Sequence, residues 1–117
     1  MRHRVKSTKL NRDQAHLDSM LRNLATSIIL YEKVKTTKAK AKVVKPIVEK
    51  LITSSKKQSL SVAMRSLNAY LSDENASKKV TRELLERYKD RNSGYLRVIP
   101  LGFRAGDAAP MVRIELV

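Results

Sequence analysis

The sequence contains no cysteine and no tryptophan, and only 4% of its residues are aromatic. Without cysteine, the chain cannot form disulfides, perform thiol redox chemistry, use a cysteine nucleophile or hold zinc through thiolates. No apolar stretch approaches the ~20 residues that a membrane-spanning helix needs. The longest run without a charged residue is Asn23 to Tyr31. The opening MRHRVKSTKL has no apolar segment behind its charges. We therefore expect no secretory signal peptide and a cytoplasmic protein.

Acidic residues are also scarce. The 117 residues include 25 Lys and Arg but only 11 Asp and Glu, which gives a formal net charge of +14. Such an excess repels itself unless a polyanion neutralises it, and a nucleic acid is the expected polyanion. The excess is concentrated in residues 1–12 and 33–57, whereas the other stretches mix both signs as a solvated surface does. The length and the 42% hydrophobic content predict one domain over residues 1–117.

Residues 1–12, here called the N-terminal arm, carry five basic residues and few apolar ones, so we expect an extended arm before a globular part over 13–117. A stripe of Leu17, Met20, Leu21, Leu24 and Ile28 then predicts an amphipathic helix, for which Asn11 or Asp13 could be the N-cap. The run Tyr31 to Thr37 is richer in β-branched residues than its neighbours and predicts a short strand.

Thr37 can cap a second helix with an apolar stripe at Ala41, Val44, Val48 and Leu51. Pro46 lies inside this helix and costs ~3 kcal/mol if the helix runs straight through, so a kink or an early break is expected there. Two further apolar stripes, separated by the polar connector SDENAS, predict a third helix and a fourth helix that ends near Gly94. The stripe of the third helix is Leu60, Ala63, Met64, Leu67 and Leu71, and that of the fourth is Val80, Leu84, Leu85 and Tyr88.

The periodicity changes in the last part of the chain. Leu96 and Val98, and later Val112, Ile114 and Leu116, alternate with other residues and predict two strands. Pro100 and Pro110 are the expected limits, and the connecting LGFRAGDAA contains glycines that permit a looped hairpin.

The stretch KVKTTKAKAKVVK has the strongest claim to bind phosphate, since it contains six lysines and no acid. Lysine ammonium groups meet phosphates as point charges, and the helix N-terminus behind Thr36 and Thr37 adds N–H groups and a positive dipole. The alternative is a solvated charged face, although such faces usually interleave acids. The candidate contacts are Lys33, Lys35, Thr36, Thr37, Lys38, Lys40, Lys42 and Lys45.

The N-terminal arm is the second candidate, with Arg2, His3, Arg4, Lys6, Lys9 and Arg12 as its expected RNA contacts. Arginine can bind a phosphate through two hydrogen bonds or stack on an unpaired base, and an arm can reach between RNA helices. The alternative is a disordered solvating terminus.

The segment Gly102 to Asp107 matches neither a Walker motif nor a dinucleotide fingerprint. Phe103 and Arg104 could point outward and serve base stacking and phosphate contact, or Phe103 could fold back onto the core. Both orientations remain open from the sequence.

Catalysis finds little support. His3 and His16 have no partner that spacing can assign, and the adjacent Asp73 and Glu74 are more typical of a solvated connector than of a magnesium site. We expect no enzyme, no cofactor, no metal and no small-molecule substrate.

The chain resembles, along its whole length, the family of the seventeenth protein of the bacterial ribosomal large subunit. The resemblance is most specific in the closing GFRAGDAAPM and IELV. The other matching residues are Arg2, His3, Arg4, Leu10, Asn11, Arg12, His16, Met20, Arg22, Asn23, Ala25, Ser27, Thr36, Thr37, Lys40, Ala41, Lys42, Gly94 and Tyr95.

This resemblance implies an α+β two-layer domain, with about four helices packed on a small three-stranded mixed sheet. It also implies binding to the large ribosomal RNA near the outlet of the nascent-chain tunnel, beside other large-subunit proteins. Four further matching residues join the expected RNA contacts on this ground, namely Asn11, His16, Arg22 and Asn23.

A nucleoid-type architectural DNA-binding protein is the alternative, because it would share the basicity and the absence of catalysis. A membrane-surface protein needs bulky aromatics on a basic helix, and few aromatics are present. Preference for structured RNA over duplex DNA of equal length separates the first two hypotheses.

Overall fold

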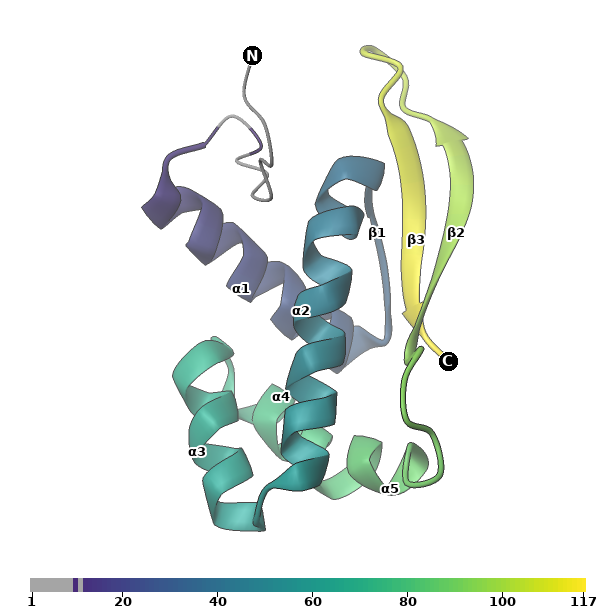
Figure 1. The fold of residues 1–117 in the computed structure, drawn as a ribbon. Coiled ribbons are helices and arrows are strands. Elements are labelled where there is room, and N and C mark those ends of the chain that lie inside the picture. The colour runs from purple at the N-terminus through teal and green to yellow at the C-terminus, as the bar shows by residue number, and fades with distance from the viewer. Residues whose placement is uncertain (1–9, 11) are drawn as a thin grey trace, which may run out of the picture.

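The computed structural model describes Leu10 and residues 12–117, and it confirms the α+β fold class. The helices lie on one side of a three-stranded sheet (Figure 1). The sheet is antiparallel throughout, so the expectation of a mixed sheet was wrong in this detail. The elements in chain order are α1 Gln14–Tyr31, β1 Lys33–Thr37, α2 Lys38–Lys57, α3 Leu60–Tyr70, α4 Glu74–Lys79, the π-helical turn η1 Val80–Leu84, α5 Leu85–Arg87, β2 Leu96–Phe103 and β3 Pro110–Leu116.

Asp13, one of the two predicted caps, begins α1, because its side chain accepts a hydrogen bond from the backbone N–H of His16 at 3.1 Å. The helix ends at Glu32, which adopts the left-handed conformation with φ 63°. Tyr31 and Glu32 therefore belong to the helix end, and the strand that was predicted to start at Tyr31 starts at Lys33. Glu32 also contacts Lys79 at 3.3 Å and pairs with Arg87, so it joins the end of α1 to the α4–α5 region.

Helix α2 starts as predicted, with the Thr37 hydroxyl accepting from the N–H of Lys40 at 3.4 Å. It then continues through Pro46 to Lys57, so of the two expected outcomes, a kink or an early break, the break was wrong. Pro46 is exposed, while the neighbouring turns bury Ala41, Val44, Val48 and Ile52 almost completely. Val44, Val48 and Ile52 each contribute about 1.5–3 kcal/mol when fully buried, which together outweighs the cost of one proline.

The fourth helix is longer at its start and shorter at its end than predicted. It begins at Glu74 because Asp73 accepts from the N–H of Asn75 at 2.8 Å, so the expected polar connector is helical from Glu74 onward. It passes through the π-helical turn η1 and ends at Arg87 rather than near Gly94. Tyr88 then packs its ring against Tyr95, with the ring centroids 5.1 Å apart.

The strand order is β1-β3-β2, so the last strand of the chain lies between the other two. Pro100 does not end β2 as predicted, because β2 is an edge strand and a missing N–H there costs no ladder hydrogen bond when it faces solvent. A register shift between Pro100 and Gly102 lets pairing continue to Phe103. Side chains such as Val112 and Ile114 point from β3 into the core against the helices.

Candidate nucleic-acid interface

The junction of β1 and α2 carries the predicted lysines on two surfaces that meet at Thr37. Lys33 and Lys35 are exposed on the sheet, and Thr36 between them is buried at 8% exposure. Since successive strand residues alternate between faces, Thr36 points toward the helices, away from any ligand on the lysine side.

Lysines continue along the outside of α2. Lys38 and Lys42 are exposed, and Lys40 and Lys45 are half-buried. Lys38 and Lys42 also border a shallow, mainly apolar groove between the start of α2 and the segment of Ala109 and Pro110.

None of the six lysines between residues 33 and 45 forms an ion pair within the described part of the chain. Their charges are therefore available to a ligand. The positive end of the 20-residue helix α2 lies at the same place and adds to the attraction for an anion.

The sheet adds basic residues that the sequence did not single out. Glu115 on β3 is 6% exposed, and its carboxylate lies 3.2 Å from Nη1 of Arg97 and 3.3 Å from Nε of Arg113. Strand pairing places Arg97 of β2 on one side of Glu115 and Lys33 of β1 on the opposite side. Alternation along the strands could have predicted that Arg97 and Arg113 face outward, but only the strand order brings them beside Lys33 and Lys35.

Four predicted RNA contacts lie on α1 or just before it, and the structure gives them different surroundings. His16 and Asn23 are exposed. Arg22 instead turns toward the end of α3, where its Nε donates to the Tyr70 carbonyl at 2.6 Å. Arg12 is half-buried and donates to the Leu10 carbonyl at 2.8 Å. Of these four predicted contacts, His16 and Asn23 are the two whose side chains face solvent without such a bond.

The β2–β3 hairpin carries Phe103 outward, with 76% of its surface exposed, which settles the orientation that the sequence left open. Arg104 is paired within the loop, because its Nε donates to Asp107 Oδ1 at 3.0 Å and its Nη2 binds the other carboxylate oxygen. This contact raises the pKa of Arg104 and, together with the Ala109 N–H, lowers the pKa of Asp107 to about 2. The arginine predicted to contact phosphate thus already has an anionic partner.

The remaining predicted contacts, Arg2, His3, Arg4, Lys6, Lys9 and Asn11, lie outside the residues that the structure describes.

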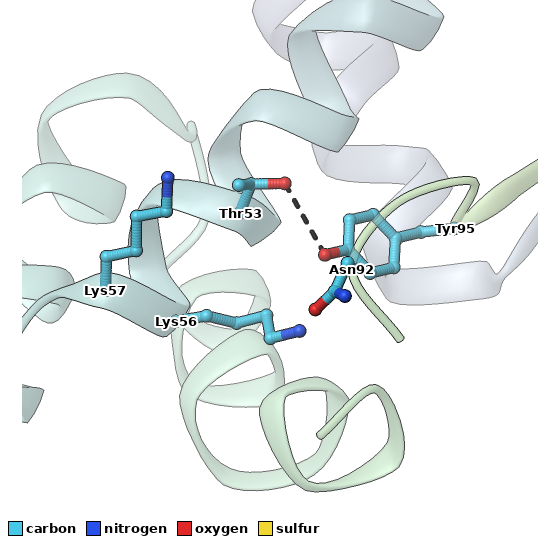
Figure 2. Close-up of a pocket in the computed structure, with 5 residues that line it drawn as sticks. All are labelled: Thr53, Lys56, Lys57, Asn92 and Tyr95. Carbon is cyan, nitrogen blue, oxygen red and sulfur yellow. Dashed lines mark hydrogen bonds between the residues drawn. The ribbon is translucent and has the colours of Figure 1, made fainter. Parts of the chain in front are cut away.

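A pocket at the other end of α2 offers little chemistry (Figure 2). Tyr95 donates its hydroxyl proton to the Arg91 carbonyl at 3.2 Å and accepts from Thr53 at 3.5 Å. Lys56 binds the same carbonyl and lies 5.7 Å from the centre of the Tyr95 ring. Since these groups satisfy one another, the pocket is a packing feature between α2 and the loop that precedes β2.

Among Leu10 and residues 12–117, no group of three or more His, Cys, Asp or Glu side chains is placed to hold a metal ion. No helix in this part of the chain is long and apolar enough to cross a membrane.

Comparison with known proteins gives a consistent result. Residues 20–117 match the family described as Ribosomal protein L17. The chain is 48% identical over all 117 residues to the large ribosomal subunit protein bL17 of Orientia tsutsugamushi (strain Boryong), covering 80% of that protein. It is 44% identical to the protein of the same name from Rickettsia typhi and 47% to that from Novosphingobium aromaticivorans, in each case over the whole chain and over 85% and 82% of the relative.

The family match shows that this small, basic α+β domain is a ribosomal protein, and the unpaired lysines on its surface fit that class. Within that class, the chain belongs to the ribosomal protein L17 family.

Proposed function

We propose that this protein is a non-catalytic structural component of the large ribosomal subunit that binds and stabilises the large ribosomal RNA in the cytoplasm. Its relatives are named as proteins of that subunit. The proposed position is near the exit of the nascent-chain tunnel, beside neighbouring large-subunit proteins.

The observation that carries the proposal is the cluster of lysines from Lys33 to Lys45 at the start of α2, none of which is neutralised within the described chain. An isolated protein gains nothing from holding so many like charges together, because they repel one another. A phosphate backbone relieves that repulsion and releases its own counterions on binding.

Binding measured against salt concentration tests the proposal. If five to ten phosphates are neutralised, the logarithm of the affinity for a structured fragment of large-subunit RNA should fall with the logarithm of salt by about 0.7–0.9 per contact. Duplex DNA of equal length should bind more weakly than this RNA at every salt concentration. Equal or tighter binding to the DNA would favour the alternative, an architectural DNA-binding protein.

Charge reversal locates the site. The double variant Lys38→Glu/Lys42→Glu should bind the RNA more weakly and reduce the salt slope by about one unit per lysine. Both side chains are exposed and lie off the apolar stripe, so the variant should fold normally. The matched control is Arg82→Glu/Lys89→Glu, which makes the same charge change at exposed residues around α5. Equal weakening in both variants would show that net charge, and not this site, determines binding.

A further inference from the structure

The sheet has one face without helices, here called the outer sheet face. Strand pairing sets two rows across it, the first with Lys33, Glu115 and Arg97 and the second with Lys35, Arg113 and Ile99. Neighbouring strands lie about 4.8 Å apart and rows of the same face about 7 Å apart. Four cationic side chains from three strands therefore lie within one small, gently twisted surface.

The charge on this surface is only partly balanced. Glu115 is its one carboxylate and is almost completely buried beneath the two arginines, whose side chains stay 57% and 42% exposed. Lys33 and Lys35 have no anionic partner among the described residues. The surface is thus complementary to a polyanion, and Glu115 lies between Arg97 and Arg113, its two ion-pair partners among the described residues.

The side chains on this face also limit which part of an RNA it can read. The next row on this face holds Thr37, Met111 and Gly102. Phe103 pairs with Pro110, which alternates with the core-facing Val112 and Ile114, so no aromatic residue of the described strands occupies a register position of this face. Sheets that read unpaired RNA bases stack them on aromatic side chains, whereas duplex RNA is contacted through phosphates and 2′-hydroxyls across its shallow minor groove.

We propose that the outer sheet face binds the sugar–phosphate backbone of duplex RNA, with Arg97 and Arg113 joining Lys33 and Lys35 as phosphate contacts. This inference rests on the proposed RNA-binding function and adds a second surface to the one at the start of α2. Because no base is stacked, recognition on this face depends on the duplex shape and not on sequence.

The test uses the full chain and two RNAs of equal length, a hairpin with a continuous stem and an unstructured single strand. The variant Lys35→Gln/Arg97→Gln removes two charges from the face and leaves Arg113 to pair with Glu115. Its matched control, Arg82→Gln/Lys89→Gln, removes one arginine and one lysine from exposed positions around α5. Circular dichroism and the urea midpoint establish that both variants are folded.

The wild-type protein and the control should prefer the hairpin, and the sheet variant should lose about two units of salt slope on it. A folded sheet variant with the wild-type slope would overturn the inference, as would a wild-type preference for the unstructured strand. If Lys38→Glu/Lys42→Glu still weakened binding in that case, the proposed function would stand without this second surface. Absence of RNA binding by the wild-type chain would overturn both.

Chemical protection provides a readout without substitutions. Lys33 and Lys35 should become resistant to acetylation when the unmodified protein binds the hairpin, while Lys89 should stay reactive. Equal acetylation of Lys33 and Lys35 in the free and bound protein would contradict the proposed contact.

Discussion

Replacing Arg22 by alanine should destabilise the protein, although the family resemblance predicted an RNA contact for this residue. Its guanidinium donates from Nε to the Tyr70 carbonyl at 2.6 Å and from Nη2 to the Ala69 carbonyl at 3.5 Å. These carbonyls belong to the last turn of α3, where helical partners are missing. Arg22 therefore satisfies the end of one helix from the middle of another.

The magnitude follows from these contacts. A hydrogen bond from a charged donor contributes about 1.5–3 kcal/mol, and a cation at a helix C-terminus adds about 0.3–1 kcal/mol. Arg22 is half-buried, so water can form some of the lost hydrogen bonds to the two carbonyls. We therefore expect Arg22→Ala to lower the free energy of unfolding by about 2 kcal/mol. With a urea dependence of about 1–3 kcal/mol per molar, the unfolding midpoint should fall by roughly 1 M.

Urea unfolding followed by circular dichroism measures this effect, and RNA binding of the folded variant measures any direct role. Asn23→Ala is the control, since the neighbouring Asn23 is exposed and its replacement should change stability by less than about 0.5 kcal/mol. An unchanged midpoint in Arg22→Ala, together with weaker RNA binding, would refute the structural role and support the RNA contact.

Three other predictions address charge and packing. Ser77→Ala should keep or raise the unfolding free energy by up to about 1 kcal/mol, since the buried Ser77 hydroxyl has no hydrogen-bond partner among Leu10 and residues 12–117; a lower urea midpoint would contradict this. The hydrogen bond from Arg87 lowers the pKa of Glu32 from 4.5, so the stabilisation is present above pH 4.5 and is lost as pH falls through the lowered value. The difference in urea midpoint between wild type and Glu32→Gln should accordingly shrink in acid, and a constant difference would exclude the ion pair as its cause. Asp107→Ala removes the oxygen that accepts from the Ala109 N–H at 3.2 Å, so it should speed amide exchange at Ala109 and leave the urea midpoint unchanged; because the pKa of Asp107 is about 2, wild-type exchange should keep this protection until the pH approaches 2.

Local patterns in the sequence predicted the elements whose causes are local. The apolar stripe on α1 and the caps Asp13 and Thr37 act within one or two helical turns, so their positions could be read directly. Pro46 was misjudged because its local cost is outweighed by core packing on the same helix, which depends on the whole fold.

The contacts that define the surfaces join distant parts of the chain and could not be read in this way. Arg22 and Tyr70 are 48 residues apart, so the sequence showed the charge but not its partner. The outer sheet face depends on β3 lying between β1 and β2, an order that alternation within each strand does not reveal. The sequence therefore predicted the lysines at the start of α2 but not the role of Glu115 in holding Arg97 and Arg113.

The central claim is that this positive charge holds the protein on the large ribosomal RNA. Sedimentation of a lysate from cells that express the tagged chain tests it most directly, in gradients run at low salt and with crosslinking of bound RNA afterwards. The account predicts that the chain sediments with the large subunit at low salt and crosslinks to its RNA through the segment from Lys33 to Lys45. Recovery of the chain as free protein or with the chromosomal DNA would contradict it.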